Sequence, residues 1–154
     1  MLPKLNCVFK WILKNLSNAA DMGEAQSFLK RAHFVKIGSG CEANVFSRKG
    51  FDYVIKIVYR PHYQNSISLI QDTPPLSHFV ESFLVDTIGG FRVILQKKID
   101  IEPKKGRDGW AMLTRFEACL KKNSKCVPFL SDVIYDNMGF DKNKPVLLDW
   151  AAVR

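Results

Sequence analysis

The sequence predicts an α+β fold in which helices pack on a five-stranded antiparallel sheet. Three short segments rich in β-branched and aromatic residues follow one another over residues 33–59, with turns between them. Two more strand-like segments, residues 78–85 and 91–99, flank the Gly89-Gly90 pair, which is typical of a tight β-hairpin. At 154 residues the chain fits one domain or one small two-lobed unit.

Helical periodicity precedes and follows these strands. Residues 4–16 carry apolar side chains at i, i+3, i+4 and i+7, which predicts an amphipathic helix. We expect its apolar face to pack on the domain, although a helix on a membrane surface has a similar pattern. Ser17 and Asp21 are candidate caps for a second helix that runs to about Lys30. A third helix is predicted over residues 109–122 from the apolar series Trp110, Leu113, Phe116 and Leu120.

The remaining segments are short. A short helix over residues 62–72 would precede the Pro74-Pro75 pair, which interrupts the chain. A basic link occupies residues 102–109, and the last 28 residues are short apolar pieces separated by polar turns.

Composition argues against several classes of protein. The four cysteines form no C-x-x-C pair and no Cys/His group has the spacing of a zinc finger, so no structural metal site is expected. No segment approaches the roughly 20 apolar residues of a membrane span, and the N-terminal residues lack the cleavage-site pattern of a secretory signal. A reducing cytoplasm is therefore the expected location.

The net charge of +8 has two explanations. Lysine tips that keep the protein soluble account for it without any function. Attraction to an anion, such as a nucleotide, a nucleic acid or an acidic protein, is the functional explanation. Basic residues are spread along the chain in short clusters, and no run reaches the five or six charges of a typical basic tail. No stripe interleaves aromatic and basic residues, so nucleic acid is the least favoured partner.

The most informative stretch is a glycine-containing turn followed by a lysine in a strand. Gly38, Ser39 and Gly40 form a G-x-G turn after the first strand, and Val45 and Lys56 lie in the next two strands. A glycine lets the backbone approach a phosphate without a Cβ in the way. A lysine on a neighbouring strand can supply positive charge to that phosphate. The alternative is a plain hairpin beside an exposed strand lysine.

A second group of polar residues lies near the C-terminus. Asp132 and Asn137 are five residues apart, and Asp149 follows twelve residues later at the end of an apolar run. Phosphoryl transfer needs a carboxylate that positions the nucleophile or accepts its proton, and oxygen donors that hold Mg²⁺ against the nucleotide phosphates. These three residues supply both. The structural alternative is that Asp132 and Asn137 form turns and that Asp149 caps one.

Together these motifs resemble the protein kinase-like superfamily, and most of all the small kinase-like proteins of lytic bacteriophages. The resemblance covers roughly residues 30–154 and follows the order Gly38-Ser39-Gly40, Val45, Lys56, Asp132, Asn137 and Asp149. The segment from Lys144 to Trp150 is also similar to aminoglycoside phosphotransferases, in which Asp-Trp replaces the Asp-Phe-Gly of protein kinases.

The resemblance implies a minimal protein kinase-like fold in three parts. These are an N-terminal helical extension over residues 1–31, a small lobe over residues 32–101, and a reduced large lobe with catalytic-type loops over residues 102–154. It also implies a serine/threonine phosphotransferase that uses ATP and Mg²⁺ in the cytoplasm of a phage-infected host. A host protein would be the substrate or target, and a second copy of the chain is a possible partner.

The same resemblance assigns a role to each site residue. Asn137 and Asp149 would hold the metal, and Asp132 would position or deprotonate the hydroxyl of the acceptor protein. Lys56 would serve both ATP binding and catalysis. The set implied to bind ATP is Gly38, Ser39, Gly40, Val45 and Lys56.

Three departures from the kinase pattern leave an alternative open. Leu130-Ser131 replaces the His-Arg that precedes the catalytic aspartate, and no acidic residue lies between Val58 and Gln71 to pair with the strand lysine. Glu81 and Glu42 are the candidate replacements. The sequence also continues only five residues beyond Asp149. The alternative is a catalytically inactive kinase-like module that binds and inhibits a host protein.

Overall fold

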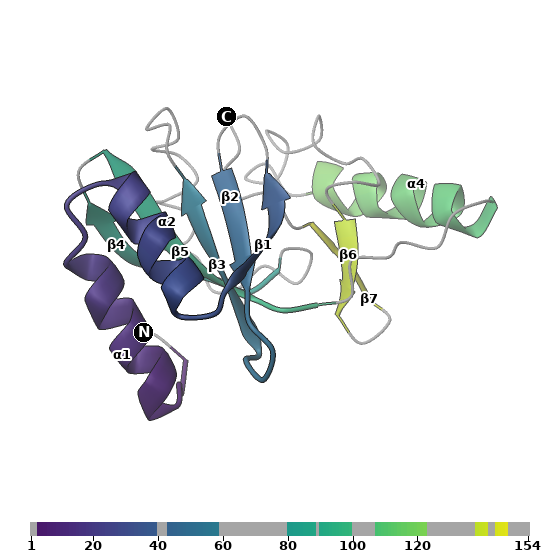
Figure 1. Cartoon of the computed structure of the whole chain (residues 1–154). Helices are drawn as coiled ribbons and strands as arrows, with labels where there is room; N and C mark the ends of the chain where they lie inside the picture. The colour runs from purple at the N-terminus through teal and green to yellow at the C-terminus, as the bar shows by residue number, and fades with distance from the viewer. Residues whose placement is uncertain are drawn as a thin grey trace.

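The computed structural model describes residues 3–39, 43–58, 80–88, 90–99, 107–122, 138–141 and 144–147. A five-stranded antiparallel sheet lies at its centre (Figure 1). The strand order is β1-β2-β3-β5-β4. The β4–β5 hairpin therefore joins the sheet through β5, which pairs with the side of β3 that β2 does not occupy. The strands are β1 (Val35–Ser39), β2 (Ala43–Ser47), β3 (Tyr53–Val58), β4 (Ser82–Ile88) and β5 (Phe91–Lys97).

This sheet confirms the predicted α+β class and the five antiparallel strands. The hairpin between β4 and β5 occurs where the two glycines predicted it, and Gly90 has a φ of 87° that side-chain-bearing residues rarely adopt. The first strand of that hairpin begins at Ser82, later than residue 78. The short helix predicted over residues 62–72 lies outside the described residues.

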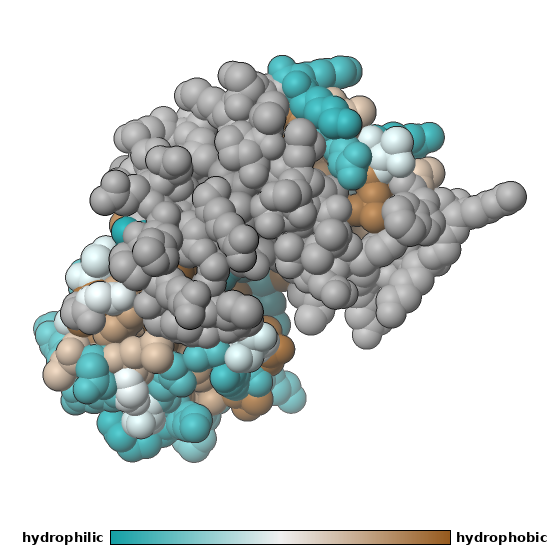
Figure 2. Space-filling model, turned by 90° about the horizontal axis from the view of Figure 1, so that it is seen from above, coloured by the Kyte–Doolittle hydropathy of each residue, from teal (hydrophilic) through white to brown (hydrophobic). Residues whose placement is uncertain are grey.

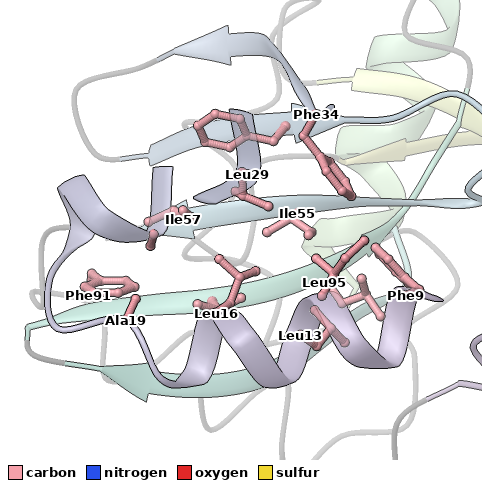
Figure 3. Close-up of a cluster of buried hydrophobic side chains, with 14 residues drawn as sticks. Phe9, Leu13, Leu16, Ala19, Leu29, Phe34, Ile55, Ile57, Phe91 and Leu95 are labelled. Carbon is pink, nitrogen blue, oxygen red and sulfur yellow. The ribbon is translucent and has the colours of Figure 1, made fainter. Parts of the chain in front are cut away.

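Two N-terminal helices cover one face of the sheet (Figures 1 and 3). They are α1 (Cys7–Ser17) and α2 (Met22–Arg31). The side chain of Asn6 caps α1 by accepting from the backbone N–H of Phe9 at 2.8 Å. Asp21 caps α2 by accepting from the backbone N–H of Glu24 at 2.8 Å. These side chains satisfy backbone donors that the first helical turns leave unpaired.

Of the two predicted caps for α2, Asp21 is confirmed and Ser17 is wrong. Ser17 is the last residue of α1, and its hydroxyl donates to the carbonyl of Leu13 at 3.2 Å. The carboxylate of Glu24 instead completes the start of α2, because it accepts from the backbone N–H of Ala20 at 2.7 Å. Helix α1 therefore ends before the cap of α2 begins.

The apolar face of α1 packs on the sheet, as its periodicity predicted. The main hydrophobic cluster joins both helices to every second residue of the central strands (Figure 3). Alternate residues of a strand point to opposite faces, so these residues define the helix-covered face. Its members include Phe9, Ile12, Leu16, Leu29, Phe34, Phe46, Ile55, Ile57, Phe91, Val93 and Leu95.

The C-terminal part contains α4 (Arg107–Lys121) and a hairpin of β6 (Met138–Asp141) and β7 (Lys144–Leu147). Helix α4 confirms the predicted third helix and buries an i, i+3, i+7 series of Leu113, Phe116 and Leu120. The strand before Asp149 was expected, but its partner β6 was not. Figure 1 shows α4 and α1 at opposite ends of the molecule.

Among the described residues, a backbone hydrogen bond and an ion pair join the β6–β7 hairpin to the region of the sheet. The backbone N–H of Val80, just before β4, donates to the carbonyl of Leu147 at 3.0 Å. The ammonium of Lys97, at the end of β5, donates to a carboxylate oxygen of Asp141 at 2.7 Å. None of the described helices is long and apolar enough to cross a membrane.

Candidate functional site

Three of the predicted ATP-binding residues lie in one row across the sheet. Gly38 of β1 is the register partner of Val45 of β2, and Val45 is the partner of Lys56 of β3. The row continues through Ile94 of β5 to Leu84 of β4. Directly opposed residues of neighbouring strands share a face, and strands lie about 4.8 Å apart. Gly38 and Lys56 therefore share one face with roughly 10 Å between their backbones.

This face is the one that α1 and α2 leave uncovered. Ile55 and Ile57, on either side of Lys56, both belong to the cluster beneath the two helices. Because side chains alternate along a strand, Lys56 points to the opposite face. The residues around it on that face are apolar, since Val54 and Val58 flank it along β3.

Lys56 is buried, with a relative exposure of 3%. The alternative of an exposed strand lysine is therefore wrong. Lysine is almost never fully buried unless it is paired, because desolvation of an ammonium is costly. Lys56 thus lies among Val54, Val58 and Ile94, and it is not without an interaction partner.

Neither backbone conformation nor packing among the described residues explains the glycine at position 38. Its φ is not positive, and a Cβ built there would lie 3.6 Å from the Cβ of Val45, which is ordinary van der Waals contact. A β-bulge between Lys36 and Gly38 shifts the register of β1 just before the turn. Bulges are frequent beside functional sites, where they re-aim a strand.

The structure does not bring all of the predicted turn residues together. Ser39 pairs with Asn44, which places both on the helix-covered side of the register rather than in the Lys56 row. Gly40 lies outside the described residues. Ser39, which was predicted to bind ATP, therefore does not share the face that carries Lys56.

Asn44 is a buried polar residue that was not among the predicted site residues. Its side chain is buried at 6% exposure, and its Oδ1 accepts no hydrogen bond from the described residues. A buried acceptor without a donor destabilises the fold unless another group satisfies it. In the structure Gly38 and Ser39 belong to β1 rather than to a turn, and Asn44 is the second residue of β2.

The predicted base and metal ligands, Asp132, Asn137 and Asp149, lie outside the described residues. The described residues nearest to them in sequence belong to the β6–β7 hairpin, in which Met138 at the start of β6 pairs with Leu147 at the end of β7. Asn137 immediately precedes Met138, and Asp149 follows Leu147 by two residues. The residues that the structure describes contain no group of three metal-binding side chains.

A polar cluster at the end of β5 was also missed. Lys97 lies opposite Tyr53 in the register, and its hydrogen bond to Asp141 raises the pKa of its ammonium. Burial, and then the charge of Glu81, raise the pKa of the Tyr53 hydroxyl. Glu81, a candidate partner for Lys56, thus acts on Tyr53 and Lys97. No pattern links Lys97 to Asp141, because 44 residues separate them.

Comparison of the sequence with models of known families finds no match, and no curated protein matches it either.

Proposed function

We propose that the protein is an ATP-dependent phosphotransferase of the serine/threonine protein kinase type that acts on host proteins during phage infection. The observation that carries the proposal is the buried Lys56 in the row with Val45 and Gly38. In protein kinases a glycine-rich loop covers the ATP phosphates and a lysine on the third strand contacts them. Lys56 lies in the third strand of this chain, which is the basis of the comparison.

The face opposite α1 and α2 carries the residue types that a nucleotide needs, and most of them are buried. Its apolar residues, such as Val45 and Ile94, suit a flat base, and Lys56 supplies the charge for a phosphate. Gly38 allows the backbone of β1 to approach the same phosphate without a side chain. In this proposal ATP binds against the face of the sheet that α1 and α2 do not cover.

The proposed metal ligands border the C-terminal hairpin in sequence. Asn137 immediately precedes β6, and Asp149 follows the last residue of β7 by two positions. In the proposal these two side chains hold Mg²⁺, which neutralises phosphate charge. Asp132 positions or deprotonates the attacking hydroxyl.

Transfer of the γ-phosphate from radiolabelled ATP tests the proposal. The assay contains the protein with host lysate, and the protein alone to detect autophosphorylation. Asp132→Asn should lower transfer by roughly 10²- to 10⁴-fold, because a general base is lost, and should leave ATP affinity almost unchanged. The proposal fails if the wild-type protein labels nothing, or if Asp132→Asn labels as well as wild type.

A specific surface favours a second function, the inactive module that binds a host protein. On α1, Trp11 is 56% exposed and Val8 is 51% exposed. The Trp11 ring lies 5.7 Å from the ring of Phe28 on α2, which holds it in place. On the face of the molecule seen in Figure 2, the coloured residues are a mixture of hydrophilic and hydrophobic ones. Exposed tryptophans are common anchors of protein interfaces.

Recovery of a host partner on immobilised protein separates the two functions. For an inactive module, Trp11→Ser should abolish recovery, whereas Lys56→Met and Asp149→Ala should leave it unchanged. For the phosphotransferase, labelling should instead depend on Lys56 and Asp149. If Trp11→Ser recovered the partner as well as wild type does, this surface would no longer support the second function.

A further inference from the structure

We propose that one face of α1 binds the surface of a lipid bilayer that contains anionic lipid. This α1 outer face consists of Cys7, Val8 and Trp11, with Lys10 and Lys14 beside them. The inference does not depend on ATP binding and goes beyond the proposed phosphotransferase. It assigns to lipid a surface that the inactive-module alternative would use for a host protein, and one set of experiments distinguishes the two.

Helix α1 has a buried face and an exposed face. The buried face packs on α2 and the sheet through an i, i+3, i+4, i+7 series of Phe9, Ile12, Leu13 and Leu16. Cys7, Trp11 and Lys14 are spaced by four and then three positions, so their side chains lie next to one another on the opposite side. Val8 lies on one flank of this row and Lys10 on the other. All five residues of the α1 outer face are exposed.

The apolar part of this face is Val8 and Trp11, which are one helical turn apart. Both are among the exposed large apolar side chains of the described residues. The ring contact with Phe28 of α2 keeps the indole of Trp11 in place, so little side-chain freedom is left to lose on binding. Because α1 and α4 lie at opposite ends of the molecule (Figure 1), a flat surface can approach α1 without meeting α4.

The charges on and next to α1 are all positive. Lys10 and Lys14 are exposed on the helix, and Lys4 is exposed just before it. The first acidic residue of the whole sequence is Asp21, which follows α1. The carboxylates of Asp21 and Glu24 both accept backbone hydrogen bonds at the start of α2. The α1 outer face therefore complements an anionic surface.

The types of residue on this face suit a bilayer better than a protein partner. Lysine is depleted from protein interfaces, where arginine is enriched, and α1 contains lysines but no arginine. Tryptophan concentrates at the headgroup level of bilayers, and anionic headgroups attract lysine. Helices that lie in this layer combine a tryptophan-containing apolar side with lysines on the polar side. In the proposal Trp11 and Val8 enter the headgroup region, and Lys10 and Lys14 contact the anionic headgroups.

Co-sedimentation with vesicles tests the inference on the full chain. The vesicles contain phosphatidylcholine alone, or phosphatidylcholine mixed with anionic phosphatidylglycerol. Val8→Ser and Trp11→Ser each remove an apolar side chain, and Lys10→Gln and Lys14→Gln each remove a positive charge. Because all four positions are exposed, the variants should fold, and thermal unfolding checks that they do.

Two exposed residues outside the α1 outer face provide matched controls. Val35→Ser makes the same change as Val8→Ser, but at an exposed valine of β1. Lys49→Gln makes the same change as the two lysine variants, but in the turn between β2 and β3. Both controls should bind vesicles as wild type does.

We expect wild type to sediment with the phosphatidylglycerol vesicles, to bind phosphatidylcholine vesicles much more weakly, and to lose affinity as salt screens the charges. Lys10→Gln and Lys14→Gln should each bind roughly fivefold more weakly than wild type. Trp11→Ser should bind at least roughly tenfold more weakly, because it removes the largest apolar surface that the bilayer would cover. Val8→Ser should weaken binding less than Trp11→Ser does.

The reactivity of two cysteines shows which face meets the bilayer. Cys7 belongs to the α1 outer face, whereas Cys119 is an exposed cysteine of α4. Alkylation of each thiol is followed by mass spectrometry of peptides, with and without phosphatidylglycerol vesicles. The vesicles should slow the alkylation of Cys7 and leave that of Cys119 unchanged.

The inference is overturned if wild type binds no vesicle, if phosphatidylglycerol makes no difference, or if the variants of the α1 outer face bind as their controls do. An unchanged rate of alkylation at Cys7 on bound vesicles would also overturn it. Recovery of a host protein that requires Trp11, without any binding to vesicles, would assign this face to a protein partner instead of lipid.

Discussion

Val45 of β2 and Lys56 of β3 are directly opposite each other in the antiparallel register. Gly38 of β1 continues the row on the other side of Val45. One face of the sheet thus carries a glycine, a small apolar residue and a buried ammonium side by side. Packing accounts for the apolar residue. In the proposed function, the glycine and the lysine are the two members of the row that contact the nucleotide.

Replacement of Gly38 by alanine should weaken ATP binding without weakening the fold. An added Cβ meets only Val45 at an ordinary distance, and alanine in a strand is favoured over glycine by up to about 1 kcal/mol. Chemical denaturation should therefore show an unchanged or slightly larger free energy of unfolding. Calorimetry should show weaker binding of Mg-ATP, because the new Cβ blocks close approach of a phosphate.

Gly50→Ala is the control for that experiment. Gly50 has a φ of 85°, so alanine there should destabilise the fold by about 1 kcal/mol while leaving ATP affinity unchanged. If Gly38→Ala bound ATP as tightly as wild type, the backbone of β1 would not approach the nucleotide.

Glycine at position 33 should stabilise the protein. His33 follows α2 with a φ of 63°, a conformation that favours glycine. Its N–H donates to the carbonyl of Lys30, and the N–H of Phe34 donates to the carbonyl of Leu29, which completes a Schellman end for α2. His33→Gly should raise the free energy of unfolding by about 1 kcal/mol. Ala32→Gly, at a residue with a φ of −80°, should not.

Asp21→Ala should destabilise the fold by about 1 kcal/mol, because the first turn of α2 loses the acceptor for the N–H of Glu24. Ser17→Ala is the comparison, since Ser17 caps no helix and should change stability by less than about 0.5 kcal/mol. Equal losses for the two variants in urea denaturation would show that the cap assignment is mistaken.

Stability should fall in alkaline solution through two groups near the end of β5. The hydrogen bond to Asp141 raises the pKa of Lys97 above its usual 10.5, so its stabilising effect is complete below that pH and disappears as pH rises through the higher value. Burial raises the pKa of Tyr53 above 10.0, so the unfolded chain loses that proton first and stability falls above pH 10.

Unfolding midpoints between pH 8 and 12 check both groups. Above roughly pH 10 the midpoint of wild type should decline more steeply than that of Lys97→Met or Tyr53→Phe, and the double variant should decline least. Parallel curves for all four proteins would show that the pKa values of Lys97 and Tyr53 do not change on folding.

The parts of the fold that could be predicted from sequence are those specified locally. The face of α1 follows from the spacing of Phe9, Ile12 and Leu16, and the β4–β5 hairpin follows from its glycines. The β6–β7 hairpin was missed because its strands have four residues each, and Gly139 and Pro145 interrupt the usual strand pattern. The strand that contains Lys56 could be predicted from its β-branched residues, but the register that aligns Lys56 with Gly38 could not.

Other features of the site depend on contacts between distant residues. The burial of Lys56 depends on what packs against its face, which a strand pattern of alternating residues does not reveal. The ion pair between Lys97 and Asp141 joins residues 44 positions apart. The sequence shows Asn44 only as a polar residue in an apolar strand. It does not show that the Oδ1 of this residue is buried without a hydrogen bond from the described residues.

The central claim is that Lys56 contacts the phosphates of a bound nucleotide, and calorimetric titration with Mg-ATP tests it most directly. Wild type and Lys56→Met are compared, with Lys49→Met as the control because Lys49 is an exposed lysine of the β2–β3 turn. We predict that wild type and Lys49→Met bind Mg-ATP with the same affinity, and that Lys56→Met, folded by circular dichroism, binds at least about tenfold more weakly, since a charged hydrogen bond of about 1.5 kcal/mol is lost. Equal affinity for Lys56→Met and wild type, or no binding by wild type at millimolar nucleotide, would contradict the claim.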